Sequence, residues 1–238
     1  MVLTAHQACY LPWLGLFHKI ALADKFILWD DVQYQPKDFN NRNKIKFPDG
    51  PKWLTVPVLR KGYLDKKYWE IEIDNTVGWG RKHWKSIEQC YRKAPYFERY
   101  HEALKFIYAQ EWKHLWLLNG ALLSLFCGQL GIPLPTEGPN RFRMLSALHC
   151  EGTKSELVLN VCKKVGATKY IFGSQGRDYA DVKAFEREGI EVIFQDYQHP
   201  NYAQRFGKFE PYMAIIDLLF NEGPNSLEIL MNGNVRSV

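Results

Sequence analysis

The first thirty residues alternate between two short apolar strands and one helix, and this pattern constrains the fold more than any other feature. Residues 2–6 (VLTAH) and 26–29 (FILW) read as buried strands, and residues 14–23 carry apolar side chains at helical spacing. Together they predict a β-loop-α-β unit. If its strands run parallel, ligands gather beyond their carboxyl ends. The polar residues expected there are His6, Gln7, Asp30 and Asp31.

The middle of the chain departs from this alternation. Residues 53–58 and 68–73 alternate like half-exposed strands, which predicts an antiparallel excursion. From residue 79 to residue 131 the pattern is helical, with a break at Pro95 and a closing glycine, Gly131. We therefore expect a mainly helical insertion at 79–131.

The last third returns to the first pattern. Residues 153–156 form a capping box that opens a helix, strands follow at 170–172 and 191–195, and a final helix is expected to start at Pro211. The sequence thus predicts one α/β domain over residues 1–238, with a Rossmann-like sheet and the helical insertion in the middle of the chain.

Composition limits the partners. The apolar fraction of 46% is enough for a sizeable core. Thirty-one Lys and Arg against twenty-six Asp and Glu give a charge of +5, which suits an anionic small molecule better than long nucleic acid. The five cysteines include no CxxC pair or zinc-finger spacing, so we expect neither disulfides nor a metal site.

Two further features concern location. The N-terminal segment has no basic region and carries His6 and Gln7 where a signal peptide would be apolar. The apolar run 115–130 is interrupted by polar residues, so it predicts a buried helix rather than a membrane span. We expect a cytoplasmic protein.

Residues after the first two strands could carry acid-base chemistry. A neutral His6 beside the Gln7 amide can accept a proton from an amine or hydroxyl. Asp30 and Asp31 follow the second strand, and neighbours in extended backbone point to opposite sides, so at most one would orient the imidazole. The alternatives are a loop histidine bonded to backbone and a pair of turn-forming acids.

Two other clusters could bind an anion. Arg42 lies in a run of asparagines and could hold a phosphate in a bidentate fork, helped by Lys82 near a helix start. The glycines in residues 173–179 (GSQGRDY) would let backbone amides approach a phosphate, although the spacing matches neither GxGxxG nor the Walker A pattern. Plain turns remain the alternative for both clusters.

Five segments resemble the WbqC-like family in order and spacing over nearly the whole chain: AHQACYLPWLGLFHKIALADKFILWDDVQY, NRNKIKFPDGPKWLTVPV, YRKAPYF, GSQGRDY and YQHPNYAQRFGKFEPYMAIIDLLFNEG. The family usually reads HQPNYLPW and GxGGRDYL at the first and fourth. Here Ala8, Cys9 and Gln175 depart from it. The resemblance implies a role in O-antigen, capsule or related glycan clusters, with modification of sugar precursors. The positions that it carries over are His6, Gln7, Tyr10, Asp30, Asp31, Gln33, Asn41, Arg42, Asn43, Gly176, Arg177, Asp178, Tyr179 and His199.

The first segment is also similar, more loosely, to the strand, histidine turn and helix of nucleotidylyltransferases and pantothenate synthetases. Those enzymes place a second histidine after a glycine. Here His18 follows Gly15 by three residues and falls inside the expected helix.

Three functions remain open. The first is acyl or aminoacyl transfer to a nucleotide- or lipid-linked amino-sugar, from a possible thioester donor. His6 would be the base, Asp30 or Asp31 its orienter, and Arg42 and Arg177 the diphosphate grips. The second is an adenylate-forming or nucleotidylyl-transferring enzyme that requires Mg²⁺. The third is a non-catalytic ligand-binding component of glycan assembly. The sequence does not indicate the oligomeric state.

Overall fold

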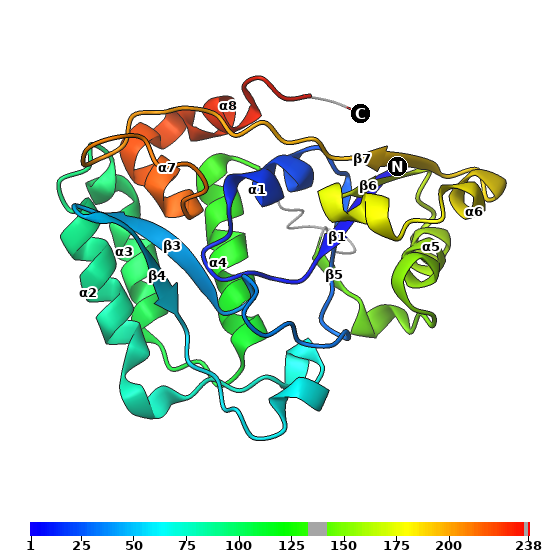
Figure 1. The fold of residues 1–238 in the computed structure, drawn as a ribbon, viewed down its shortest axis with the longest axis horizontal. Coiled ribbons are helices and arrows are strands. Elements are labelled where there is room, and N and C mark those ends of the chain that lie inside the picture. Colours follow the sequence, from blue (N-terminus) through cyan, green and yellow to red (C-terminus); the bar gives the residue numbers. More distant parts are fainter. Residues whose placement is uncertain (133–141, 236–237) are drawn as a thin grey trace.

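A computed structural model of the protein describes residues 1–132, 142–235 and 238. Its centre is a parallel sheet whose strands run in the order β5, β2, β1, β6, β7 (Figure 1). The bounds are Phe142–Met144 for β5, Lys25–Leu28 for β2, Val2–His6 for β1, Lys169–Phe172 for β6 and Glu191–Phe194 for β7. Every neighbouring pair in this sheet is parallel, so the predicted α/β class is confirmed.

The order of the strands reverses once in the sheet, beside β1. From β1 the chain adds β2 and then β5 on one side, and it later adds β6 and β7 on the other side. In parallel sheets, loops on either side of such a reversal separate and leave a crevice at the carboxyl ends of the strands. Here that crevice falls between β1 and β6.

Each face of the sheet buries its own layer. Leu3, Ala5 and Phe172 pack with helices α5 (Lys154–Val165) and α6 (Val182–Arg187). On the other face, Phe26 and Leu28 join the cluster that contains α1 (Leu14–Ala21). Side chains alternate across short apolar strands, so a sheet covered on both faces follows from the sequence pattern.

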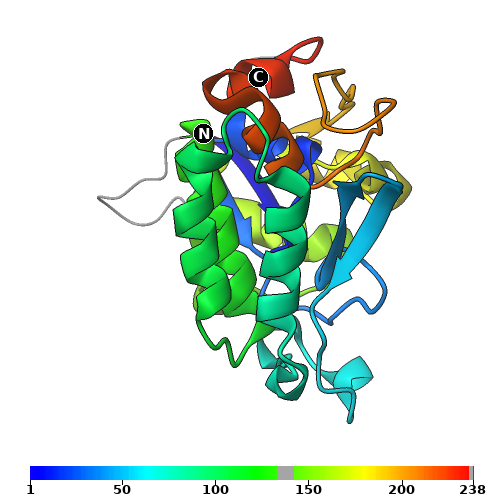
Figure 2. The same ribbon diagram turned by 90° about the vertical axis from the view of Figure 1, so that its left-hand side faces the viewer.

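The helical stretch predicted at 79–131 contains three helices, α2 (Trp79–Tyr91), α3 (Phe97–Ala109) and α4 (Leu115–Leu130). They run side by side, with α2 and α3 at the opposite end of the molecule from α5 and α6 (Figures 1 and 2). None of the helices in the described ranges is both long and apolar enough to cross a bilayer.

The predicted antiparallel excursion is present in part: residues 53–58 and 68–73 meet in an antiparallel bridge between Val58 and Ile73, and the longer antiparallel pairing is a hairpin that precedes it. The hairpin pairs β3 (Arg42–Phe47) with β4 (Gly50–Thr55) through the two-residue turn Pro48-Asp49, and Gly50, which begins β4, has a φ of 115°. Residues 68–73, predicted as a strand, instead begin with the short 3-10 helix Tyr68–Glu70. The sequence pattern did not reveal β3, the main partner of β4, because β3 begins within the Asn-rich run that reads as a loop.

The C-terminal helix also begins later than predicted. The helix α7 spans Ile215–Glu222, whereas the sequence indicated a start at Pro211. Tyr212 has a left-handed φ of 61°, and Ala214 forms a bridge with Trp13. These residues are therefore extended or strained, and the helix begins after them. A last helix, α8 (Ser226–Met231), packs against α1.

Candidate active site

A cavity of about 610 Å³ opens at the carboxyl ends of β1 and β6, where the strand order reverses. We call it the switch-point cleft. Its volume lies within the range of ordinary small-ligand sites. The lining residues come from β1, β6, α1, α5 and the loops that follow β1, β2 and β6, namely Ala5, His6, Gln7, Lys19, Trp29, Val32, Asp38, Lys154, Leu157, Val158, Tyr170, Phe172, Gly173, Gln175, Gly176, Asp178 and Tyr179.

A second cavity of about 220 Å³ adjoins the first. We call it the side cavity. Its lining adds Trp13 and Phe39, whose rings lie 5.2 Å apart, and Asn40. Both cavities share one set of residues, which forms their common wall: His6, Gln7, Lys19, Asp38, Gly173 and Gln175.

His6 ends β1 in that common wall. Its Nδ1 lies 2.7 Å from the Gln7 carbonyl oxygen, and its ring meets Trp13 edge-on at 5.4 Å. A carbonyl oxygen only accepts, so Nδ1 carries the hydrogen and Nε2 is the acceptor. Burial and then the Lys19 charge lower the pKa of His6 from 6.5 to about 4. His6 is therefore a neutral imidazole at pH 7, with Nε2 able to accept a proton or a hydrogen bond.

Gln7 fixes the loop that follows His6. Its Nε2 donates to the Gln33 carbonyl oxygen at 3.0 Å, and Gln33 in turn donates to the Leu64 carbonyl oxygen at 2.7 Å. Gln33, predicted to bind ligand, lines neither cavity and instead holds two loops together.

Lys19 is a buried member of the common wall that the sequence analysis missed. Its side chain is 4% exposed, and its ammonium group donates to the Ala5 carbonyl oxygen at 3.0 Å. Burial lowers the pKa of Lys19 to about 8. The available signal was the composition of α1, an otherwise apolar helix in which only His18 and Lys19 are polar.

The glycine loop also reaches the cleft, as the sequence predicts. It forms the short 3-10 helix Ser174–Asp178 (η5), and its lining residues include Gly176, Asp178 and Tyr179. A Cβ on Gly176 would lie 2.5 Å from the Phe172 Cβ, so the glycine permits close packing of the loop on β6. Arg177 is exposed and stacks 4.8 Å from the centre of the Phe194 ring, outside the cleft lining.

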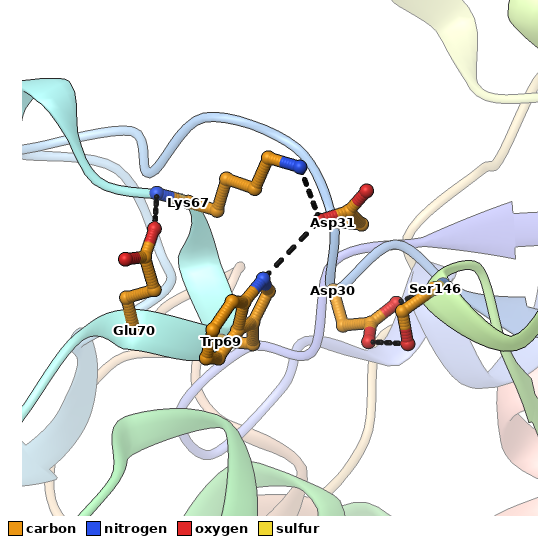
Figure 3. Close-up of polar contacts among 6 residues, drawn as sticks. All are labelled: Asp30, Asp31, Lys67, Trp69, Glu70 and Ser146. Carbon is orange, nitrogen blue, oxygen red and sulfur yellow. Dashed lines mark hydrogen bonds and ion pairs between the residues drawn. The ribbon is translucent and has the colours of Figure 1, made fainter. Parts of the chain in front are cut away.

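Asp30 and Asp31 do point to different sides (Figure 3), and the hydrogen-bond and ion-pair partners of their carboxylates are residues other than His6. The Asp30 carboxylate accepts from the Ser146 backbone N-H at 2.9 Å and from its hydroxyl at 2.5 Å. The Asp31 carboxylate pairs with Lys67 at 2.6 Å and accepts from the Trp69 indole at 3.2 Å. The role of imidazole orienter, predicted for one of them, is corrected: the Gln7 carbonyl oxygen occupies Nδ1.

Asn41, Arg42 and Asn43 line neither cavity, although the preceding residue, Asn40, borders the side cavity. Asn41 donates to the Val56 carbonyl oxygen at 2.8 Å, and Asn43 to the Leu11 carbonyl oxygen at 2.6 Å. The Arg42 guanidinium stacks 4.6 Å from the centre of the exposed Trp53 ring and donates to a backbone oxygen. These asparagines hold β3 in place. The Asn-rich segment and the η5 loop therefore do not form the shared diphosphate-binding site that the sequence suggested.

The remaining predicted residues have structural partners or lie on other surfaces. Tyr10 is buried, with its hydroxyl 2.7 Å from His83 Nδ1 and 2.5 Å from the Tyr108 hydroxyl. Lys82 is exposed on α2. His199 lies between the Pro200 carbonyl oxygen and the Tyr212 backbone N-H, at 2.9 and 3.1 Å. None of the three lines either cavity.

A metal centre has no candidate in the part of the chain that the structure describes, where no group of three or more His, Cys, Asp or Glu side chains converges. The geometry that remains is a neutral acceptor nitrogen, a buried ammonium group and a glycine-containing loop around one crevice. This arrangement can bind a polar, anionic ligand and remove a proton from it.

Comparison with known proteins identifies relatives of the chain. A model of the WbqC-like protein family matches residues 7–229. An uncharacterized protein of Mycobacterium tuberculosis is 38% identical over 226 residues, which cover 94% of this chain and 95% of that protein. No solved structure matches the chain.

Proposed function

The chain belongs to the WbqC-like protein family, and on that premise we propose that it is a cytoplasmic transferase of cell-surface glycan assembly. Its substrate is a nucleotide- or lipid-linked amino-sugar of the O-antigen or capsule type, and the reaction is acyl or aminoacyl transfer. One observation carries the proposal: a neutral His6 faces a ligand-sized cleft at the switch point of a parallel sheet. The strand order also supports the Rossmann-like interpretation of the sheet.

The proposed step is nucleophilic acyl transfer. The amino-sugar nitrogen attacks the carbonyl carbon of an acyl or aminoacyl thioester or ester. The new C-N bond forms as the C-S or C-O bond breaks. His6 Nε2 takes the proton from the nitrogen and returns it to the leaving sulfur or oxygen. Tyr179, which is 43% exposed at the cleft, offers an aromatic face for the sugar.

Nucleotidylyl transfer receives less support from the geometry. That chemistry would use a second histidine in the site. His18 instead lies 2.8 Å from the Gln195 side-chain nitrogen through Nδ1 and 3.0 Å from the Val235 carbonyl oxygen through Nε2. It lines neither cavity.

A non-catalytic binding role is the second candidate, and the basicity of His6 favours it. A base with a pKa of about 4 is weak at neutral pH, because general bases act best when their pKa lies near the working pH. In that case His6 would only accept a hydrogen bond from a ligand hydroxyl or amine.

Native mass spectrometry of the freshly purified protein tests these alternatives first. We expect a retained nucleotide-linked sugar or acyl thioester. The next measurement is acyl transfer from an acyl or aminoacyl thioester to UDP-, dTDP- and GDP-linked amino-sugars. The mass gain on the sugar is followed with and without EDTA. Turnover that survives EDTA supports acyl transfer, and turnover that needs Mg²⁺ and a nucleoside triphosphate supports nucleotidylyl transfer. Binding without any turnover would leave the non-catalytic role.

A further inference from the structure

We propose that the Lys19 ammonium group binds an anionic group of the ligand, a phosphate or a carboxylate, at the wall common to the switch-point cleft and the side cavity. For the proposed substrate that anion is the diphosphate of the sugar carrier. The identity of the anion rests on the proposed function, whereas the presence of an anion site does not.

The first argument is that Lys19 is buried without a counter-charge. Its side chain is 4% exposed, and its ammonium donates to one backbone carbonyl oxygen, that of Ala5. Among the residues that the structure describes, Lys19 takes part in no ion pair. Lysine is rarely buried unless it is paired, because a desolvated charge destabilises the fold. A ligand anion would supply the missing partner.

Lys46 shows the ordinary alternative in the same protein. It is 3% exposed, but its ammonium donates to the Gln204 side-chain oxygen at 3.0 Å and to the Lys208 carbonyl oxygen. It lines neither of the two cavities. Lys46 therefore stabilises a loop, whereas the comparably buried Lys19 borders the switch-point cleft and the side cavity.

The charged and titratable neighbours fit this role. His6 and Cys9 face Lys19 from β1 and the loop that follows it. Burial raises the pKa of the Cys9 thiol well above its usual range, so Cys9 is neutral. Asp38 lines both cavities, accepts from the Phe39 backbone N-H at 2.7 Å and would repel a bound anion. Replacing Asp38 with Asn should therefore strengthen anion binding.

An anion at Lys19 would also change His6. The Lys19 pKa of about 8 reflects burial without a counter-charge, and a bound anion would raise that pKa. The same anion, lying near His6, would raise the pKa of about 4 there and partly offset the effect of Lys19. Substrate binding would thus make His6 a stronger base at the time when a base is needed.

Sulfate is the first probe, because it carries no titrating proton near pH 8. NMR of protein labelled at the lysine side chains should show a Cε resonance with a midpoint near pH 8. That resonance should be absent in Lys19→Met, and sulfate should move its midpoint upward. Calorimetry at pH 8 in buffers of different ionisation enthalpy should show uptake of up to about half a proton per sulfate.

The variants separate a binding role from a structural one. In Lys19→Met, sulfate binding should weaken at least about tenfold, the usual effect of losing a charge-assisted hydrogen bond. Lys46→Met is the buried control and Lys105→Met, on the exposed face of α3, is the surface control. Both should bind sulfate as the wild type does. Should Lys19→Met fail to fold, the wild-type titration alone still decides.

The outcomes for this site and for the proposed function are distinct. An upward shift of the Lys19 midpoint by sulfate supports the site, even if no nucleotide-linked amino-sugar binds and the proposed function fails. Equal affinity of wild type and folded Lys19→Met for both sulfate and a nucleotide-linked amino-sugar would overturn the site and leave the function standing. A Lys19 midpoint that sulfate does not move would overturn it as well.

Discussion

Burial and a backbone hydrogen bond together determine the tautomer and the protonation state of His6. The Gln7 carbonyl oxygen fixes the tautomer, and desolvation keeps the ring neutral far below the usual pKa of histidine. No carboxylate is needed for either effect. The two aspartates that the sequence suggested as partners serve other segments, one holding Ser146 and the other Lys67 (Figure 3).

The aspartates give the first prediction. Asp30→Asn should lower the free energy of unfolding by about 1–3 kcal/mol, because Asp30 is buried and accepts two charge-assisted hydrogen bonds from Ser146. Asp31→Asn should change it by less than about 1 kcal/mol, since its partner Lys67 is half exposed. Urea unfolding measures both. A larger loss for Asp31→Asn than for Asp30→Asn would contradict these assignments.

The second prediction concerns acid stability. Below pH 6.5 the unfolded chain protonates His6, whereas the folded protein does so only near pH 4. The unfolded state binds more protons in that window, so stability falls as the pH drops from 6.5 to 4. For His6 the loss is at most about 3 kcal/mol, because the ring is partly exposed. His6→Gln should lose correspondingly less across the window. Urea unfolding of wild type and His6→Gln at pH 7 and at pH 4 measures the loss of unfolding free energy in each protein. An equal loss in the two proteins would contradict the prediction.

At the scale of elements, close packing of η5 on β6 shapes one wall of the cleft. Gly176→Ala would place a methyl group against Phe172, so we expect a destabilisation of about 1–3 kcal/mol and weaker ligand binding. The control is Gly128→Ala on the exposed side of α4, where a Cβ meets no atom within 4 Å. That change should be neutral or stabilise by up to about 1 kcal/mol. Thermal unfolding compares the two, and equal stability of both variants would argue against the contact.

Elements formed by local patterns were predictable from the sequence, and those set by distant contacts were not. The β1-α1-β2 unit follows from periodicity within thirty residues, and its parallel pairing is confirmed. The start of β3 depends on the Asn43 amide reaching Leu11, which lies 32 residues away. The late start of α7 depends on the bridge between Ala214 and Trp13. Neither contact produces a periodic pattern in the sequence.

The same division applies to the candidate site. His6, Gln7, Gly176 and Asp178 were predicted to lie together, and they line one cavity, because they follow strands whose carboxyl ends share an edge. Lys19 was missed because a lysine in the last turn of a short helix normally reaches solvent, and its burial depends on layers contributed by distant segments. Asp30 was misassigned because its partner Ser146 lies 116 residues away.

At the scale of the whole molecule, the strand order determines where these parts meet. The chain reverses its direction of sheet growth beside β1, and both cavities border that reversal. The helices α2 and α3 lie toward one end, with α4 nearer the middle (Figure 1), and none of the three supplies a lining residue. Function is therefore expected to depend on the residues at the carboxyl ends of β1 and β6. Substitutions on the exposed faces of α2, α3 and α4 should affect stability only.

The central claim is that His6 takes the substrate proton in the switch-point cleft. A pH-rate profile of acyl transfer to the nucleotide-linked amino-sugar, for wild type and His6→Gln, tests it most directly. Wild-type turnover should fall on the acid side with a midpoint above the free-protein value of about 4, because a bound anion raises it. Folded His6→Gln should be slower by about a hundredfold or more and lack that limb. A folded His6→Gln protein with wild-type turnover and an unchanged acid limb would contradict the account.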